Sequence, residues 1–153
     1  RKPGRLTLQE WEVMKTHARL GGEALARVES DLDAPVPFLQ YAKEIAYWHH
    51  ERWDGSGYPD GLKGEEIPVS ARLMALAAVF DALISMRSYK APMSLAQTCE
   101  TIAAERGRHF DPDMTDASLA DAQAFHAIAQ RYVEPAPAGG AAAAWPLAAP
   151  APG

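Results

Sequence analysis

The spacing of apolar residues along the chain predicts a series of helices separated by polar loops. The first helix opens at Thr7-Leu8-Gln9-Glu10, a pattern typical of a capping box. Apolar residues then recur at near-helical spacing, at Leu8, Trp11, Met14, Ala18 and Leu25. Gly21 and Gly22 either weaken the middle of this helix or allow close packing there. Residues 29–37 are expected to form a loop, because they contain two prolines.

The remaining elements are predicted in the same way. A second helix is expected from about Phe38 to Glu51, and residues 53–68, with four glycines and two prolines, form an irregular loop. Residues from about Ser70 to Met86 are apolar on nearly every face, which indicates a central buried helix. Two more helices follow, one from the capping-box pattern at Ser94 to Gly107, and one from Pro112 to about Tyr132. No segment favours a strand, so we expect an all-α fold.

The composition of the chain indicates how far the folded domain extends and in which compartment the protein lies. After Glu134 the chain contains only Ala, Pro and Gly with one Trp and one Leu, so residues 134–153 are predicted to be a disordered tail behind one domain over residues 1–133. Cys99 is the single cysteine, which fits a reducing compartment such as the cytoplasm. No apolar run approaches the roughly 18 residues of a membrane-spanning helix, and no signal peptide is seen. We therefore expect a cytoplasmic protein that does not bind membranes.

The net charge of −5 excludes a general nucleic-acid binder, which would be basic. Local cations can still hold the phosphates of a nucleotide. Arg87 and Lys90 lie three residues apart after the apolar helix and suit an anionic substrate. Alternatively, they are cations that favour the dipole at a helix end.

The densest polar cluster covers residues 49–59 and begins with His49 and His50. Consecutive residues on a helix point about 100° apart, so this pair cannot easily coordinate one ion from the middle of a helix. From a helix end, the two side chains could reach neighbouring ions. Neutral imidazole suits Fe, Mn, Zn or Ni. Alone, such a pair is more often one core histidine beside one solvated histidine. His17 can come near them in a bundle, although alone it favours a structural role.

Two further histidines have less specific surroundings. His109 follows a predicted helix end, where capping or loop packing is favoured over a role as a metal ligand. His126 has no partner in the sequence and is expected to be solvated.

Taken together, the motifs resemble the HD-GYP family in order and spacing over residues 1 to about 125. The block from His49 to Pro59 carries most of this specificity. The matching segments are Lys2-Pro3-Gly4, Leu6, Glu10, Met14-Lys15-Thr16-His17, Gly21, His49-His50-Glu51-Arg52-Trp53-Asp54-Gly55-Ser56-Gly57-Tyr58-Pro59, Gly61-Leu62, Ile67-Pro68, Ala71-Arg72, Val79-Phe80-Asp81-Ala82-Leu83, Arg87-Ser88-Tyr89-Lys90 and Gly107-Arg108-His109-Phe110-Asp111-Pro112.

The resemblance implies an HD-type helical bundle with two or three divalent metal ions, Fe or Mn, that hydrolyses cyclic di-GMP to pGpG or GMP. It implies that substrate phosphates are held after the third helix and that the Gly-Tyr-Pro loop contacts substrate or a protein partner, with Asp54 shaping that loop. A receiver or other sensory domain is expected upstream. The residues that match family positions are the metal ligands His17, His49 and His50, the phosphate-binding Arg87 and Lys90, and the motif residues Gly57, Tyr58 and Pro59.

Two departures from the family pattern bear on activity. The His-Asp dyad that names the family has no counterpart here, and the resemblance places it before residue 1, so we expect a C-terminal portion that is incomplete at its N-terminus. Ala78 stands where the family has a metal-binding Asp, and Asp81, three residues on, is a substitute or a structural acceptor. No residue of this chain is assigned as catalytic.

These departures leave three hypotheses. In the first, the chain is part of a cyclic di-GMP phosphodiesterase and has weak or no activity by itself. In the second, it is a degenerate module that binds cyclic di-GMP or a signalling partner without turnover. The third hypothesis is a different HD-type phosphohydrolase, which the block Gly57-Tyr58-Pro59 argues against.

Overall fold

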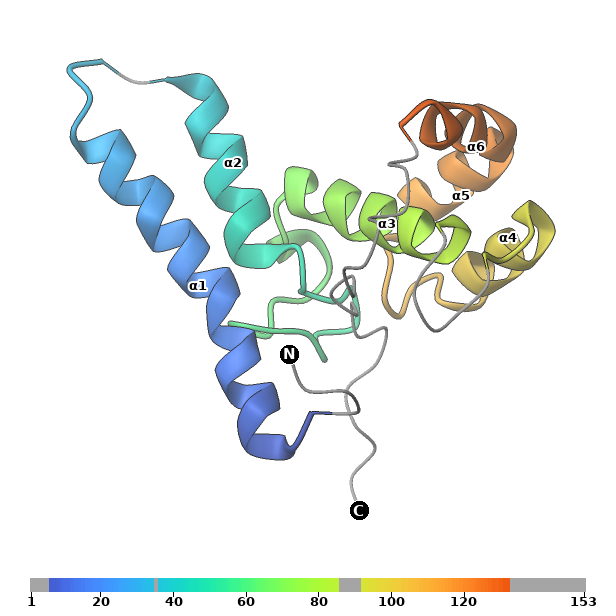
Figure 1. Ribbon diagram of the computed structural model, residues 1–153, viewed down its shortest axis with the longest axis horizontal. Helices are drawn as coiled ribbons and strands as arrows, with labels where there is room; N and C mark the ends of the chain where they lie inside the picture. Colours follow the sequence, from blue (N-terminus) through green and yellow to red (C-terminus); the bar gives the residue numbers. More distant parts are fainter. Residues whose placement is uncertain (1–5, 35, 86–91, 133–153) are drawn as a thin grey trace, which may run out of the picture.

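A computed structural model describes residues 6–34, 36–85 and 92–132 of the 153-residue chain. Every regular element within these ranges is a helix, which confirms the predicted all-α class (Figure 1). Arg87, Lys90 and the predicted tail lie outside the described residues. The elements are α1 (Leu8–Ser30), α2 (Pro37–Trp48), the 3-10 helix η1 (Gly64–Glu66), α3 (Val69–Ile84), α4 (Leu95–Ala104), α5 (Pro112–Ala120) and α6 (Ala122–Arg131).

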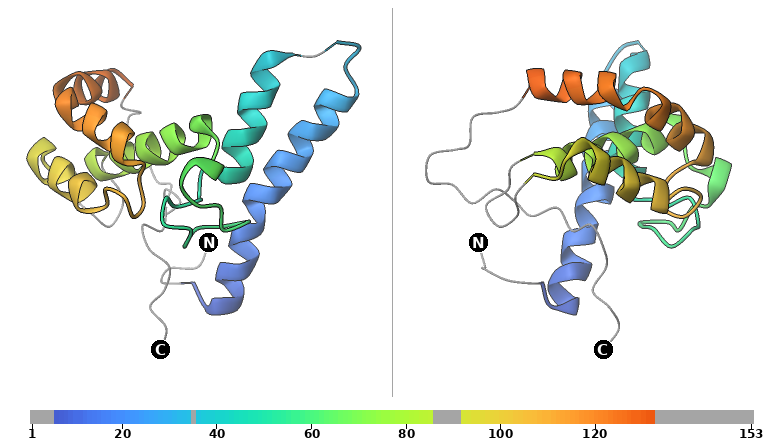
Figure 2. Two further views of the ribbon diagram at one scale, coloured as in Figure 1. Left: turned by 180° about the vertical axis from the view of Figure 1, so that it is seen from behind. Right: turned by 90° about the vertical axis from the view of Figure 1, so that its right-hand side faces the viewer.

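The helices form two groups joined through α3. Helices α1 and α2 make an antiparallel hairpin on one side, while α4, α5 and α6 gather around the other end of α3 (Figures 1 and 2). The main apolar cluster lies in the second group, where α3 packs against α4 and the segment before α5. Its buried residues are Leu76, Val79, Phe80, Leu83, Ile102 and Phe110.

The α1–α2 hairpin depends on a close approach at one glycine. A Cβ atom added to Gly22 would lie 2.1 Å from the Tyr47 ring, whereas one added to Gly21 would meet only the Ala46 Cβ at 3.6 Å. The close-packing alternative is therefore correct for Gly22 and not for Gly21. The capping box at Thr7 is also confirmed, because the Thr7 hydroxyl accepts from the Glu10 N–H and the Glu10 carboxylate accepts from the Thr7 N–H.

The glycine pair allows a matched test of this packing. We expect Gly22→Ala to lower the free energy of unfolding by about 1–2 kcal/mol, because the Tyr47 ring must move. Gly21→Ala should instead raise it by about 0.5–1 kcal/mol, because alanine favours the helix and finds ordinary space there. Urea unfolding of the two variants measures both values. Equal effects at the two positions would contradict this account of the hairpin.

The helix ends differ from the predictions in three places. Helix α2 ends at Trp48 rather than Glu51, because the Glu51 N–H turns back to the Trp48 carbonyl at 2.9 Å. Helix α4 ends at Ala104, before the predicted stop at Gly107. The predicted last helix is two helices, because Asp121 leaves helical backbone geometry (φ −125°, ψ 36°).

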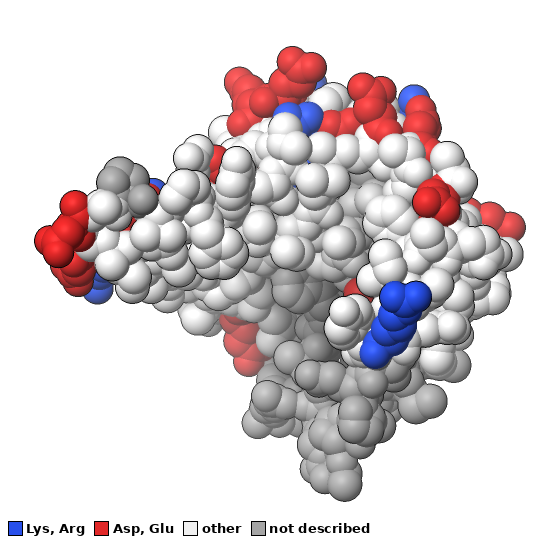
Figure 3. Space-filling view, turned by 90° about the horizontal axis from the view of Figure 1, so that it is seen from above, with Lys and Arg blue, Asp and Glu red and all other residues white. Residues whose placement is uncertain are grey.

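Helix α3 is central but is not buried on every side, so that part of the prediction is wrong. Val69 and Leu73 are 54% and 51% exposed, and Met74 is 37% exposed. Seen from above, the face over α2, α3 and α6 shows few charged side chains in its middle (Figure 3). None of the helices in the described ranges is long and apolar enough to cross a membrane.

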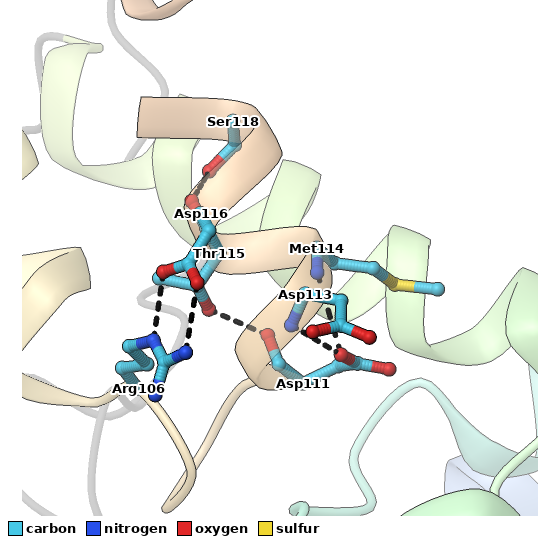
Figure 4. A network of polar contacts seen from close by, with 7 residues as sticks. All are labelled: Arg106, Asp111, Asp113, Met114, Thr115, Asp116 and Ser118. Carbon is cyan, nitrogen blue, oxygen red and sulfur yellow. Dashed lines mark hydrogen bonds and ion pairs between the residues drawn. The ribbon is translucent and has the colours of Figure 1, made fainter. Parts of the chain in front are cut away.

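Helix α5 is fixed at its start by Asp111, a buried acid. One Asp111 carboxylate oxygen accepts from the N–H groups of Asp113 and Met114, at 2.8 and 3.3 Å (Figure 4). The other oxygen pairs with Arg72 of α3 at 2.7 Å. This charge pair therefore ties the second helical group to α3.

Candidate metal centre

Three histidines come together where α2 ends beside α1. His49 is the C-terminal cap of α2, and His50 follows in the turn. The Nε2 atom of His50 lies 3.0 Å from Nε2 of His17 on α1. One ring nitrogen from each of the three residues lies within 4.8 Å of the others. The early end of α2 allows both members of the pair to face His17, which a continuing helix would prevent.

Backbone carbonyl groups orient two of these rings. Nδ1 of His17 lies 2.6 Å from the Met14 carbonyl oxygen, and Nδ1 of His49 lies 2.6 Å from the Ile45 carbonyl oxygen. A carbonyl oxygen only accepts, so each Nδ1 carries the proton and donates it. In this tautomer Nε2 carries the lone pair, an arrangement typical of histidines that bind metals.

Burial keeps His49 and His50, at the C-terminal end of α2, neutral. It lowers the pKa of His50 to about 3, helped by the nearby charges of His49, His17 and His109. It also lowers the pKa of His49. Neutral imidazole is the form that binds a metal ion, so near neutral pH no proton has to leave these two rings first.

The Gly-Tyr-Pro loop folds back onto the histidines. The Tyr58 ring stacks on His50 with 4.6 Å between ring centroids, and the Tyr58 N–H donates to the His50 carbonyl at 3.3 Å. Burial raises the pKa of the Tyr58 hydroxyl, which has no hydrogen-bond partner among the described residues. Gly57 packs directly against the backbone of residues 51 and 52. A Cβ atom added to Gly57 would lie 2.4 Å from the backbone nitrogen of Arg52.

Glu51 holds this loop in place, a role that the sequence analysis missed. Its side chain is buried, and Oε1 accepts from the N–H groups of Asp60 and Gly61 at 2.8 and 3.1 Å. Burial raises the pKa of this carboxyl group. The only signal in the sequence is an acidic residue at the entry to a glycine-rich loop, which is equally typical of a solvated side chain.

Asp54 shapes the next turn of the loop through its side chain. One carboxylate oxygen accepts from both the N–H and the hydroxyl of Ser56, at 2.9 and 2.6 Å. Backbone bonds then join this part of the loop to the segment after α4. The Trp53 N–H donates to the His109 carbonyl at 3.1 Å, and the Asp54 N–H donates to the Arg108 carbonyl at 2.9 Å.

The other candidate residues do not belong to the group of three converging ring nitrogens. His109 is stacked on Phe110, consistent with loop packing. His126 was expected to be solvated, and this holds only in part. Its side chain is half-buried, with Nε2 paired to Gln130 at the surface and Nδ1 buried. Asp81 is exposed and accepts from the Ser85 hydroxyl at 3.2 Å. Among the described residues, no carboxylate joins the three histidines within the same 4.8 Å.

The buried His109 predicts a loss of stability in acid. Burial and the charge of Arg52 lower its pKa to about 4, whereas the unfolded chain takes up this proton near pH 6.5. Stability is therefore full above pH 6.5 and falls as the pH drops towards 4. We expect His109→Gln to lose about 1 kcal/mol less between pH 7.5 and 5.0, allowing for partial exposure. Urea unfolding at both pH values measures this, and an unchanged loss would contradict it.

Similarity to known proteins identifies the family of this chain. Residues 1–114 match the family model described as HD domain. The chain belongs to the HD domain family. Its HD-GYP membership is confirmed by relatives that are about half identical over most of the chain.

Three relatives illustrate the similarity of this HD-GYP chain. It is 53% identical over 133 residues to a probable cyclic di-GMP phosphodiesterase of Vibrio cholerae, a match that covers 87% of the chain and 30% of the relative. It is 49% identical over 118 residues to the cyclic di-GMP phosphodiesterase response regulator RpfG of Xanthomonas campestris, covering 77% and 30%. It is 47% identical over 127 residues to the 3'3'-cGAMP-specific phosphodiesterase 2 of Vibrio cholerae, covering 83% and 23%. The chain thus spans less than a third of each relative.

Proposed function

We propose that this chain supplies three histidine ligands of a metal centre in a cyclic di-GMP phosphodiesterase. The observation that carries the proposal is the facing pair of Nε2 atoms in His17 and His50, 3.0 Å apart. The carbonyl partner of His17 Nδ1 turns its Nε2 towards that meeting point. The substrate is proposed from two relatives that are named as cyclic di-GMP phosphodiesterases.

The three imidazoles fit a divalent ion, because they bring three ring nitrogens to one point. We propose Fe or Mn, with two or three ions once a carboxylate-bearing segment with the His-Asp dyad completes the centre. The ion, when bound, would polarise a phosphate oxygen and lower the pKa of a water molecule. The chain's own contribution is to bring ring nitrogens of His17, His49 and His50 to one point, to keep His49 and His50 neutral through burial, and to place Tyr58 against His50.

Substrate and partner contacts are proposed from the family match. Arg87 and Lys90 hold the substrate phosphates, and the loop of Gly57, Tyr58 and Pro59 contacts substrate or a protein partner. We propose a receiver or other sensory domain upstream, because one relative is named as a response regulator. We also propose a cytoplasmic location, which fits the single cysteine, Cys99.

A chimeric protein tests the activity directly. Residues 1–133 would replace the matching segment of the 53% identical Vibrio cholerae relative, which supplies the rest of a longer protein. We expect the chimera to hydrolyse cyclic di-GMP, and its His50→Ala variant to lose both metal and turnover. A folded, metal-loaded chimera without turnover would refute the proposed activity and favour the module that binds without turnover.

Two further measurements on the chimera separate the alternatives. One relative is named as specific for 3'3'-cGAMP, so both cyclic dinucleotides are assayed in parallel. Ala78 takes the family's metal-binding Asp position, so Ala78→Asp is expected to raise metal occupancy and turnover. No change in either quantity would show that Ala78 does not face the centre.

A further inference from the structure

A second feature of the molecule adjoins the Tyr58 ring. Between α1 and the Gly-Tyr-Pro loop there is a hollow of about 170 Å³. This is below the roughly 300 Å³ at which pockets for drug-sized ligands begin, so the hollow suits one chemical group rather than a whole dinucleotide. It is lined by Glu12, Lys15, Thr16, Arg19, Tyr58 and Pro59.

The charge of this hollow is opposite to that of the chain. Among the described residues that line it, Lys15 and Arg19 are the cations and Glu12 is the one acid, so their formal charges sum to +1 on a chain of charge −5. Lys15 and Arg19 are four residues apart on α1, which places them on one face of the helix, one turn apart. A single anion can therefore contact both side chains.

The position of Lys15 is already partly fixed. Its Nζ lies 2.8 Å from a Glu12 carboxylate oxygen and 6.0 Å from the centroid of the Tyr58 ring. An exposed ion pair of this kind contributes little free energy, because water and salt screen it. Glu12 is thus an exchangeable counterion, which a more highly charged anion would displace from Lys15.

We propose that this hollow binds a phosphate group through Lys15 and Arg19. Phosphate offers several oxygens in a tetrahedral arrangement, and it suits the fork of an Arg beside the point charge of a Lys. Tyr58 adjoins both features, because it lines this subsite and its ring stacks on His50. The proposal goes beyond the proposed function, because the described residues that line the hollow include none of the candidate metal ligands.

The test is a nuclear magnetic resonance titration of the metal-free full chain at fixed ionic strength. The ligands are inorganic phosphate, GMP and cyclic di-GMP, added separately. We expect saturable shifts of backbone amides in residues 12–19 with at least one of them. Arg19→Ala should weaken that binding about three- to tenfold. Glu12→Gln should strengthen it about twofold, because Lys15 loses its competing counterion.

Arg27→Ala is the matched control, because it removes an exposed cation from the same helix two turns away from Arg19. It should leave binding unchanged. The absence of saturable shifts with all three ligands would overturn the proposal, as would equal losses in the Arg19 and Arg27 variants. Weaker binding in Glu12→Gln would also overturn it.

The arms of the experiment separate the source of the phosphate. Binding of cyclic di-GMP that depends on Arg19 would make the hollow a substrate subsite, and Arg19→Ala would then raise KM in the chimera without lowering kcat. If only the binding of inorganic phosphate or GMP depends on Arg19, the hollow is a separate phosphate site. Phosphate binding that depends on Arg19 would stand even if the chimera proved inactive, so the two proposals fail independently.

Discussion

Replacing His17 with alanine is expected to lower the affinity of this chain for Mn²⁺ by more than about 100-fold. Loss of a group that only orients a ligand costs 10- to 100-fold, so loss of a ligand should cost more. His17 is exposed and its ring reaches His50 at 3.0 Å, so its removal leaves two donors and no new cavity in the core. The electron paramagnetic resonance signal of free Mn²⁺ measures the affinity.

The control for this experiment is His126→Ala on α6, far along the chain from the three histidines. Its affinity for Mn²⁺ should equal that of the parent chain. Circular dichroism of both variants should show unchanged helix content. Equal losses of affinity in the His17 and His126 variants would show that Mn²⁺ binds elsewhere.

Replacing Gly57 with alanine is expected to lower the free energy of unfolding by about 3 kcal/mol. The added Cβ would lie 2.4 Å from the Arg52 nitrogen and 2.5 Å from the Glu51 Cα, and neither backbone atom can swing aside as a side chain can. The loop must therefore move, which separates Tyr58 from His50. Urea unfolding measures the stability, and tyrosine ring resonances report the lost stacking.

Gly61→Ala in the same loop is the matched comparison. Gly61 has a φ of +69°, so alanine there is strained, but its Cβ would meet only the Gly55 carbonyl oxygen, at 3.6 Å. A left-handed backbone at a residue other than glycine costs about 1 kcal/mol. We therefore expect Gly57→Ala to be the more damaging change. The reverse order would mean that backbone conformation, rather than close contact, determines the shape of this loop.

Features fixed by neighbouring residues were predictable from the sequence. The capping boxes at Thr7 and Ser94 are both present, because each needs only residues within one turn. The order of the elements was also predictable, except that the last helix is two. The convergence of His17 with His49 and His50 followed from the family resemblance rather than from spacing, because an adjacent pair alone favours a core role.

Features that depend on distant contacts were not predictable. Helix α2 ends early because residues 57–61 fold back onto its last turn, with Asp60 accepting from the Trp48 indole N–H at 2.8 Å. Glu51 acquires its role only when that loop closes around its carboxylate. Nor does the apolar pattern of α3 show which side stays exposed, because that depends on where the other helices pack.

The bonds from Trp53 and Asp54 to the segment after α4 have a consequence for the order of folding. They join residues more than 50 positions apart, and the Arg52–Glu105 ion pair at 2.8 Å spans a similar distance in sequence. Contacts of this range close large loops and form slowly. The α1–α2 hairpin can therefore bring the histidines together before their flanking loop is complete. A nascent chain that ends before α4 would carry all three histidines without the final shape around them.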